Sequence, residues 1–371
     1  MDSYLRPGGD AVALEDSIMQ KGQPVTAGSK MLENFISPLD ATVVERLRGQ
    51  GVAIVGRARM TEFGVARISG DRPEGISGAV DAVADGSARW ALCNDVFGIN
   101  RRLAAQNGVC YIHPTYGTVS RYGLVHLASS MDQIGVVCRN AEDGFALLGR
   151  IAGKDANDGA MFPEARYDYA STGKDITVGL PEAVIGRAGT AQKAALREFA
   201  GRFRGAAVQI PLFPLVKQVM YILASAEISS NLTRYDGIKF GYQAPRYRSL
   251  KELYTNTRTE AFGLDAKLAA IMGTMFLSQG YYTRYYDKAM RLRRLVKESL
   301  TFAGYDVLAL PCAIGDDPYE NLSLYALAPL AGLPSLVFPQ QRQGIQLIAA
   351  ARNENALLTA WKSATKSATK G

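Results

Sequence analysis

Apolar positions recur along the chain with two different periods, which predict alternating helices and strands. Val43, Val44 and Leu47 have helical spacing, and they follow Asp40, a residue type that is favoured at helix N-caps. A helix is therefore expected to begin at Asp40. The run Gly51–Gly56 is short, apolar and bounded by glycines, which predicts a buried strand.

The alternation continues towards the C-terminus. Further helices are expected over residues 79–86, 103–108, 140–151 and 190–203. Strands are expected within 10–25 and over 109–112, 175–180 and 306–311, while 327–334 and 344–349 are expected to close a sheet. Residues 153–169 are polar and rich in turn formers, so they are expected on the surface. The tandem repeat SATKSATK predicts a solvated low-complexity tail over 363–371, which leaves 1–362 as a single domain.

Composition favours a globular protein without a membrane span. The 371 residues are 47% hydrophobic and 21% charged, and no apolar run reaches the length of about 18 residues that a spanning helix needs. The N-terminus has neither a basic region nor an apolar core, so no secretory signal is expected. These features predict a location in the cytoplasm or an organelle matrix.

Cysteine and histidine usage argues against a metal centre. The four cysteines lie in apolar surroundings without any CxxC spacing, and there are two histidines. We therefore expect buried free thiols, no metal and no cofactor. The net charge of +7, from 42 basic and 35 acidic residues, permits an RNA partner without predicting one.

The stretch Pro73–Gly117 holds the candidate chemistry. Glycine and serine are dense at its start, a composition that brings backbone N–H groups close to a ligand or an oxyanion. However, Ile76, Val80, Phe97 and Ile99 stand where such a loop would need small or polar side chains. The pattern indicates the frame of an active site without its reacting groups.

Three motifs in this stretch resemble those of a known enzyme family. The chain reads P-E-G-I-S-G-A-V at 73–80, D-V-F-G-I-N-R-R-L at 95–103 and Y-I-H-P-T-Y-G at 111–117. These are similar to P-G-G-S-S-G-G-S, D-T-G-G-S-I-R-x-P and G-L-K-P-T-Y-G of the amidase-signature family, in particular of the A subunits of tRNA-dependent amidotransferases. The resemblance runs from about residue 10 to about residue 360. It implies an α/β amidase-signature fold, a mixed central sheet with helices on both faces.

The resemblance also implies that the catalytic triad is replaced. The family uses a Ser–Ser–Lys triad whose lysine lies in a V-A-x-K-D-N motif, and here V-A-L-E-D-S places Glu15 at the lysine position. Ile76 stands at the bridging-serine position and Ile99 at the nucleophile position. A hydroxyl remains at Ser77, and Phe97 replaces a loop glycine, so the oxyanion site is expected to be filled or distorted.

Other positions of the family's pocket are retained or eroded. The remnants of a substrate pocket are Asp95, Arg101, Tyr235 and Arg293. For Asp95 and Arg101 the favoured interpretation is that they stabilise the loop, while Tyr235 and Arg293 either line the pocket or persist as fold elements. Leu322 and Pro329 replace polar residues of the family's glutamine site. Residues 65–72 are expected to replace a longer family segment, and the helical segment that precedes the first strand in the family is expected to be missing.

Two groups of residues outside the triad have a simpler interpretation. Internal hydrogen bonding behind the pocket is expected for Tyr116, Arg121, Asp132 and Gln133. The segment 281–294 combines tyrosines with arginines, which permits nucleic-acid binding. Packing against the enzyme body is the favoured interpretation, because the similar family segment belongs to that body.

The leading hypothesis is a catalytically inactive relative of the amidotransferase A subunit. It would have a structural or regulatory role with protein partners, such as B- and C-like subunits or a larger translation assembly, with tRNA or another RNA as an indirect partner. The rival is an active amidase or glutaminase subunit with a site reorganised around Glu15 and Ser77. A third possibility is a decaying paralogue without a selected role.

Overall fold

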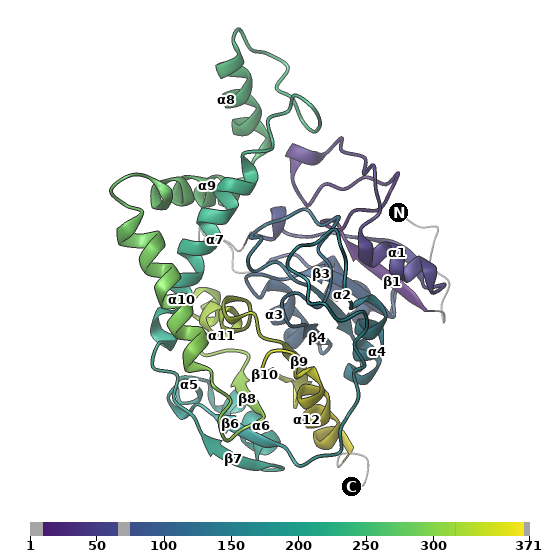
Figure 1. Cartoon of the computed structure of the whole chain (residues 1–371), viewed down its shortest axis with the longest axis vertical. Coiled ribbons are helices and arrows are strands. Elements are labelled where there is room, and N and C mark those ends of the chain that lie inside the picture. The colour runs from purple at the N-terminus through teal and green to yellow at the C-terminus, as the bar shows by residue number, and fades with distance from the viewer. Residues whose placement is uncertain (1–9, 66–74, 316, 367–371) are drawn as a thin grey trace.

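The fold is built on one large mixed β-sheet (Figure 1). A computed structural model describes residues 10–65, 75–315 and 317–366. Within this part the sheet has ten strands in the order β2-β1-β3-β5-β4-β9-β10-β8-β6-β7. The strands are β1 (Ala11–Glu15), β2 (Ala53–Ala58), β3 (Trp90–Asn94), β4 (Cys110–His113), β5 (Ile134–Cys138), β6 (Thr177–Leu180), β7 (Arg204–Ala207), β8 (Val307–Pro311), β9 (Ser335–Gln340) and β10 (Gln343–Ala349).

Strand directions differ between the two ends of the sheet and its middle. Strand β1 is parallel to β2 and β3, and β6 is parallel to β7 and β8. Antiparallel pairs join β3 to β8 through β5, β4, β9 and β10. The fold predicted from the family motifs, a mixed central sheet in an α/β domain, is therefore confirmed.

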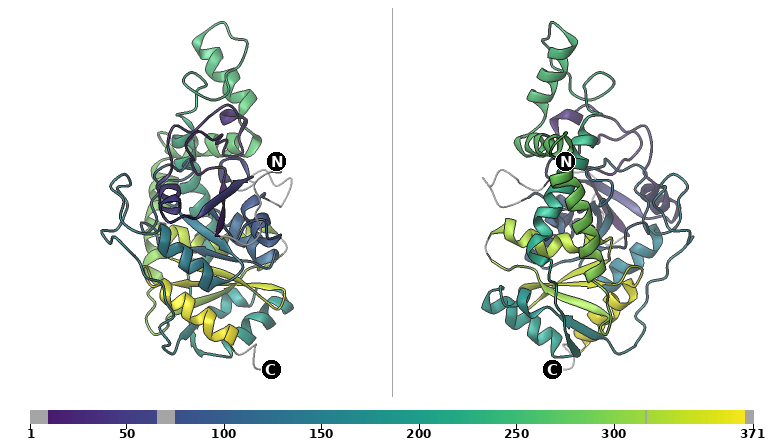
Figure 2. Two further views of the ribbon diagram at one scale, coloured as in Figure 1. Left: turned by 90° about the vertical axis from the view of Figure 1, so that its right-hand side faces the viewer. Right: turned by 60° about the vertical axis from the view of Figure 1, so that its left-hand side comes forward.

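Helices cover both faces of the sheet, and each face has its own hydrophobic core (Figure 2). Alternation along β3 shows the division, since Trp90 and Leu92 enter one core while Ala91 and Cys93 enter the other. The first core lies under α1 (Thr42–Gly49), α4 (Ala141–Ile151), α5 (Glu182–Ile185), α6 (Thr190–Ala200) and α12 (Glu354–Lys366). The second lies under α2 (Gly78–Ala84), α3 (Ile99–Gln106), α7 (Val216–Leu232) and α11 (Pro318–Ala331).

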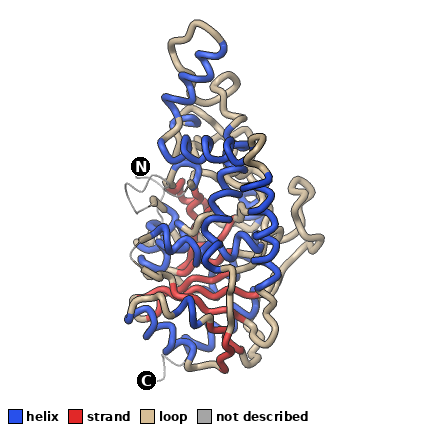
Figure 3. Tube along the Cα trace, turned by 90° about the vertical axis from the view of Figure 1, so that its left-hand side faces the viewer, coloured by secondary structure: helices blue, strands red, loops and turns tan. Residues whose placement is uncertain are grey.

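Three more helices extend the second layer away from the sheet. Helices α9 (Leu264–Leu277) and α10 (Lys288–Ser299) pack on α7, with a π-helical turn, η4 (Thr283–Asp287), between them. Helix α8 (Leu250–Ala261) projects beyond the body of the molecule (Figure 3). The ends of β1 and β3 lie under α2 and α3, which belong to the same second layer. Tyr281, Tyr282 and Tyr285 of the tyrosine-rich segment 281–294 are exposed, so the packing predicted for this segment does not hold for these three side chains.

The first two predicted elements differ from the structure. The N-cap of α1 is Ala41 rather than Asp40, because the Asp40 carboxylate accepts from the backbone N–H of Lys21 (2.8 Å) and pairs with Arg48. Strand β2 is not buried: it is the edge strand of the sheet, and most of its residues are exposed or half-buried.

Two predictions near the C-terminus were also wrong. Residues 327–331 end helix α11, and the strand that joins the sheet, β9, begins only after the predicted segment 327–334, whereas the predicted 344–349 is β10. The predicted solvated tail begins as helix, since α12 continues to Lys366 and Ala364 packs into the core. Residues 66–72 of the predicted short replacement segment and residues 367–371 of the predicted tail lie outside the described residues.

Candidate active site

The candidate site lies at the carboxyl ends of two parallel strands. Strands β1 and β3 are hydrogen-bonded neighbours, so their carboxyl ends lie at the same edge of the sheet. Glu15 is the last residue of β1 and Asn94 the last of β3. Because side chains alternate along a strand, Glu15 points to the same face as Ala13, where α2 and α3 pack.

The Glu15 carboxylate is buried and held by three donors. The Ser17 hydroxyl donates to Oε1 (2.7 Å), and the backbone N–H of Asn94 donates to the same oxygen (3.1 Å). The Asn100 amide donates to Oε2 (3.2 Å). Burial nevertheless dominates, and it raises the pKa of Glu15 to about 7 against these hydrogen bonds. Glu15 is thus poised between its neutral and charged forms near neutral pH.

Ile76 and Ile99 lie in front of Glu15. The three residues line a small, partly open pocket of about 10 Å³ together with Thr61 and Asn94, which is the space of roughly one water molecule. The Ile99 side chain lies so close to the loop that a Cβ on Gly75 would meet its Cγ2 at 2.5 Å, whereas the Ile76 side chain is 50% exposed. The structure therefore brings the three predicted triad positions together around a small pocket.

Ser77 has a structural task in the described chain. It is the N-cap of α2, and its side-chain oxygen accepts from the backbone N–H of Val80 (3.2 Å). Its side chain is buried, and among the described residues no hydrogen bond joins it to Glu15. The hydroxyl predicted to survive is thus present, without a base as its partner.

Phe97 occupies the position where the family has a loop glycine. Its ring is buried and packs against Tyr221, with ring centroids 5.9 Å apart. The next residue, Gly98, is the N-cap of α3 with φ of +82°, and a Cβ there would lie 2.2 Å from the Cβ of Tyr325. An aromatic side chain therefore fills space beside a backbone turn that only glycine can make.

Asp95 and Arg101 form a buried ion pair below the loop. Arg101 donates from Nε (2.9 Å) and from its backbone N–H (3.0 Å) to Asp95 Oδ2, and its Nη1 donates to the carbonyl of Tyr325 (2.7 Å). Both side chains are almost fully buried. The structure supports the predicted stabilising role, because the pair ties the loop to the start of α3 and to α11.

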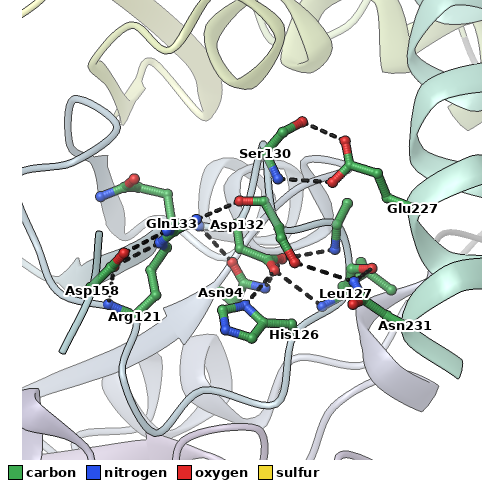
Figure 4. A network of polar contacts seen from close by, with 12 residues as sticks. Asn94, Arg121, His126, Leu127, Ser130, Asp132, Gln133, Asp158, Glu227 and Asn231 are labelled. Atoms are coloured by element: carbon green, nitrogen blue, oxygen red, sulfur yellow. Dashed lines mark hydrogen bonds and ion pairs between the residues drawn. The ribbon is translucent and has the colours of Figure 1, made fainter. Parts of the chain in front are cut away.

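A wider polar network holds Asn94 from behind (Figure 4). Its amide donates to Asp132 (2.8 Å), and its side-chain oxygen accepts from the backbone N–H of Gln133 (2.8 Å). Arg121 donates to Asp158 (2.6 Å) and to the Tyr116 hydroxyl (2.7 Å). Internal hydrogen bonding is confirmed for Tyr116, Arg121 and Asp132, whereas the buried Gln133 side chain has no partner among the described residues.

Tyr235 and Arg293 lie apart from the Glu15 cavity. Tyr235 stacks on Phe63 with centroids 5.3 Å apart, and burial raises its pKa to about 12. Arg293 donates from Nε to the carbonyl of Leu330 (2.8 Å) and from Nη1 to the Ser130 hydroxyl (2.7 Å). Burial lowers the pKa of Arg293. Both residues act as internal ties in the described chain, and a role in binding substrate stays a prediction.

The residues that donate hydrogen bonds to Glu15 were not predicted from the sequence. Ser17, Asn94 and Asn100 supply its donors. One signal was available: Asn100 stands where the family motif D-T-G-G-S-I-R has isoleucine, directly after the nucleophile position. The family motif is apolar at this position. A polar residue here, near a carboxylate that stands at the family's predicted lysine position, is the pattern expected of two substitutions that compensate each other.

In the described residues, neither the cysteines nor metal-binding side chains form a second candidate active site. All four cysteines are buried and free. No group of three or more histidine, cysteine, aspartate or glutamate side chains with a metal-binding arrangement occurs in the described ranges. No helix in the same ranges is long and apolar enough to cross a membrane.

Comparison with known proteins gives one consistent family. The sequence profile of the amidase family matches residues 9–70 and 77–358, with Ile76 inside the gap. The A subunit of glutamyl-tRNA(Gln) amidotransferase from Lachnoclostridium phytofermentans is 36% identical over 370 residues, which covers 89% of this chain and 75% of that protein. Its counterpart from Neisseria meningitidis serogroup A is 38% identical over 369 residues and covers 89% and 77%.

A solved structure agrees with these relatives. The A subunit of glutamyl-tRNA(Gln) amidotransferase from Thermotoga maritima matches with a TM-score of 0.75 at 27% identity, covering 97% of this chain and 84% of that chain. The chain has a mixed sheet with helices on both faces and a glycine- and serine-rich loop beside two strand ends. This combination is typical of amidase-signature proteins. The chain belongs to the amidase family, and its relatives named above are A subunits of glutamyl-tRNA(Gln) amidotransferase.

Proposed function

We propose that this chain is a catalytically inactive amidase-fold component of an amidotransferase-like assembly, with a structural or regulatory role. The observation that carries the proposal is the state of the three predicted triad positions. Glu15, Ile76 and Ile99 line a small, partly open pocket of about 10 Å³, and neither isoleucine carries an atom that attacks a carbonyl carbon or transfers a proton. An amide substrate would need both groups and the space between them.

The contacts of Glu15 and Phe97 support a stable structural role for this region rather than an active site that is ready to bind substrate. The Glu15 carboxylate, which would otherwise be a buried unpaired acid, is satisfied by Ser17, Asn94 and Asn100. Phe97 packs into the core at a loop position where the family has glycine. The contacts of Glu15 and Phe97 are thus satisfied around the predicted triad positions, which supports this proposal over a decaying paralogue.

A second candidate function is an active amidase with a reorganised site, and one observation favours it. A carboxyl group whose pKa lies near 7 has the acidity that suits a general base at neutral pH. In this alternative Glu15 would activate Ser77. The described contacts supply no link between these two side chains, since Ser77 accepts from Val80 and Glu15 accepts from Ser17, Asn94 and Asn100.

The relatives direct the proposal towards a complex. Those with 36–38% identity are named as subunits of a glutamyl-tRNA(Gln) amidotransferase. We infer that this chain binds proteins of the same kind, B- and C-like subunits, and that tRNA or another RNA would be reached through them. The assembly would work in the cytoplasm or an organelle matrix.

Ammonia release from purified protein tests the inactive assignment. We expect wild-type protein and Ser77→Ala to release no more ammonia from glutamine, asparagine or simple aliphatic amides than buffer does. Turnover that disappears in Ser77→Ala would instead establish the second candidate, with Ser77 as the nucleophile. Pull-down of B- and C-like subunits, with and without tRNA, then tests the structural role.

A further inference from the structure

Two of the four buried cysteines face each other across neighbouring strands. Cys110 begins β4 and Cys138 ends β5, and the antiparallel register places these two residues directly opposite each other. Both side chains belong to the hydrophobic core that lies under α4. Directly opposed side chains on one face of an antiparallel pair are within contact distance of each other. The sheet therefore brings together two thiols that are far apart in the sequence.

The two sulfur atoms are close enough to interact. Burial raises the pKa of the Cys138 thiol well above its usual range, and a side-chain hydrogen bond with Cys110 raises it further. The Cys138 sulfur also lies against α4, where a Cβ on Gly144 would come within 2.3 Å of it. Gly144 thus leaves room for the sulfur, and the thiol beside it is that of Cys110.

The strand pair has the spacing that a disulfide requires. A disulfide joins residues whose Cα atoms are about 4.4–6.8 Å apart. Directly opposed residues of an antiparallel pair have Cα separations of about 4.5–5.5 Å, depending on whether they share hydrogen bonds. A bond between Cys110 and Cys138 therefore needs the side chains to turn, while the strands stay in their register.

Neither of the other two cysteines in the described chain faces a second thiol. Cys93 lies on β3 and Cys312 follows β8, and both belong to the core on the opposite face of the sheet. Strands β5, β4, β9 and β10 lie between β3 and β8, which separates these two cysteines by roughly 20 Å or more at about 4.8 Å for each strand. Cys93 and Cys312 are therefore internal controls for the opposed pair.

The opposed pair lies close to solvent, although both of its side chains are buried. Cys138 is followed directly by Arg139 and Asn140, which are exposed, and Cys110 comes two residues after the exposed Gly108. The pair thus lies where β4 begins and β5 ends, and strand ends open locally at a lower free energy than the middle of a sheet. Such opening gives a small oxidant access to the thiols.

We propose that Cys110 and Cys138 form a redox-responsive dithiol, which hydrogen peroxide converts into a cross-strand disulfide. The thiolate of one cysteine attacks the peroxide, which releases hydroxide and leaves a sulfenic acid. The thiolate of the other cysteine attacks the sulfenic sulfur, forms the S–S bond and releases a second hydroxide. The two protons from the thiols convert both hydroxides into water, so two thiols and one peroxide give one disulfide and two waters. This chemistry does not depend on whether the triad is inactive.

The disulfide would join the two ends of the segment that supports the candidate site. The residues between the two cysteines include Arg121 and Asp132 of the polar network behind Asn94. A cross-link removes conformations from the unfolded chain, so the oxidised protein should resist unfolding more strongly than the reduced protein. Buried thiols react slowly, and we therefore expect the reduced pair in a reducing compartment and the disulfide under peroxide.

A count of free thiols by mass tests the proposal. The folded protein is treated with hydrogen peroxide, then unfolded in guanidinium chloride and alkylated with N-ethylmaleimide. We expect four adducts on the untreated protein, one for each cysteine, and two after oxidation. Peptide mapping should place the two remaining adducts on Cys93 and Cys312, and it should find Cys110 linked to Cys138.

Two variants make the assignment specific. Cys110→Ala should keep three adducts after the same treatment, because Cys138 has lost its partner. Cys312→Ala is the matched control, since it also removes a buried thiol but leaves the pair intact; it should fall from three adducts to one. Thermal melting establishes that each variant is folded, and Cys138→Ala replaces Cys110→Ala if the latter is not.

Four results would overturn the proposal. Four adducts after oxidation would show that the folded chain forms no disulfide. Cysteines that lose their adducts by gaining oxygen, without a cross-link, would exclude the second step. A disulfide that includes Cys93 or Cys312, or that joins two chains, would show that the opposed pair is not the reactive one. A melting temperature that falls on oxidation, instead of rising by a few degrees, would show that the strands must distort to accept the bond.

Discussion

At the scale of single residues, the burial of the Glu15 carboxylate has a cost that the fold limits but does not remove. Three donors surround the carboxylate, yet burial raises its pKa from 4.5 to about 7. Between these two values the folded chain holds a proton that the unfolded chain has released. Stability from this group is therefore present at low pH and is lost as the pH rises towards and beyond 7.

Substitution of Glu15 by glutamine tests this linkage. Between pH 5 and pH 9 the free energy of unfolding of the wild type should fall by about 3 kcal/mol more than that of Glu15→Gln, since a shift of about 2.5 pH units corresponds to roughly that energy. Urea unfolding at a series of pH values measures the difference. Glu298→Gln, which alters an exposed surface pair, is the control and should follow the wild type. Parallel profiles for wild type and Glu15→Gln would contradict the account.

The sequence was informative about residues whose partners are close along the chain. Asp95 and Arg101 are six positions apart on one loop and helix start, and their buried ion pair is compatible with the loop-stabilising role expected of them. The donors to Glu15 were missed because Asn94 and Asn100 reach it only through the pairing of β1 with β3. Asp40 was misassigned as a helix cap, because its partners, Lys21 and Arg48, compete for the same carboxylate.

At the scale of elements, the loop between β3 and α3 decides whether the site can form at all. Asn94 ends β3 and Gly98 is the N-cap of α3, so three residues lie between them. Gly98 has positive φ and no room for a side chain against Tyr325. The turn is therefore fixed by one glycine and by the ion pair below it.

Replacement of Gly98 by alanine should be severely destabilising. The left-handed backbone costs a non-glycine residue about 1–2 kcal/mol, and the clash with Tyr325 should add about 1–3 kcal/mol. Gly22→Ala is the matched control, because Gly22 has a similar φ of +76° but nothing within 4 Å of its Cβ position. Denaturant unfolding should show a loss for Gly98→Ala at least twice that for Gly22→Ala; equal losses would mean that the contact with Tyr325 relaxes freely.

Whether a segment forms a strand was predicted better than whether that strand is buried or lies at the edge of the sheet. Apolar runs gave β1, β4, β6 and β8 their correct places, because buried strands are continuous apolar segments. The same reasoning made β2 a buried strand, although it is the sheet edge. Strand order is a long-range property, and a short apolar run does not reveal how many neighbours it has.

At the scale of the whole molecule, an amidase fold surrounds the small pocket beside Glu15. The sheet order, the two cores and the network behind Asn94 are complete in the described residues. The family could be predicted from motifs that lie far from the triad as well as near it, whereas inactivity rests on three side chains. The central claim is accordingly that no activated nucleophile exists in this chain.

Intact-mass measurement after treatment with a serine-directed sulfonyl fluoride tests that claim most directly, because it does not depend on knowing the amide substrate. A family member with an intact triad serves as the positive control, and it should gain one sulfonyl group. We predict that this chain gains none at neutral pH, since no described residue forms a hydrogen bond that would make it a base for Ser77 and Ile76 and Ile99 have no hydroxyl. A single adduct on Ser77 that is absent from Ser77→Ala would contradict the account and would identify a working nucleophile.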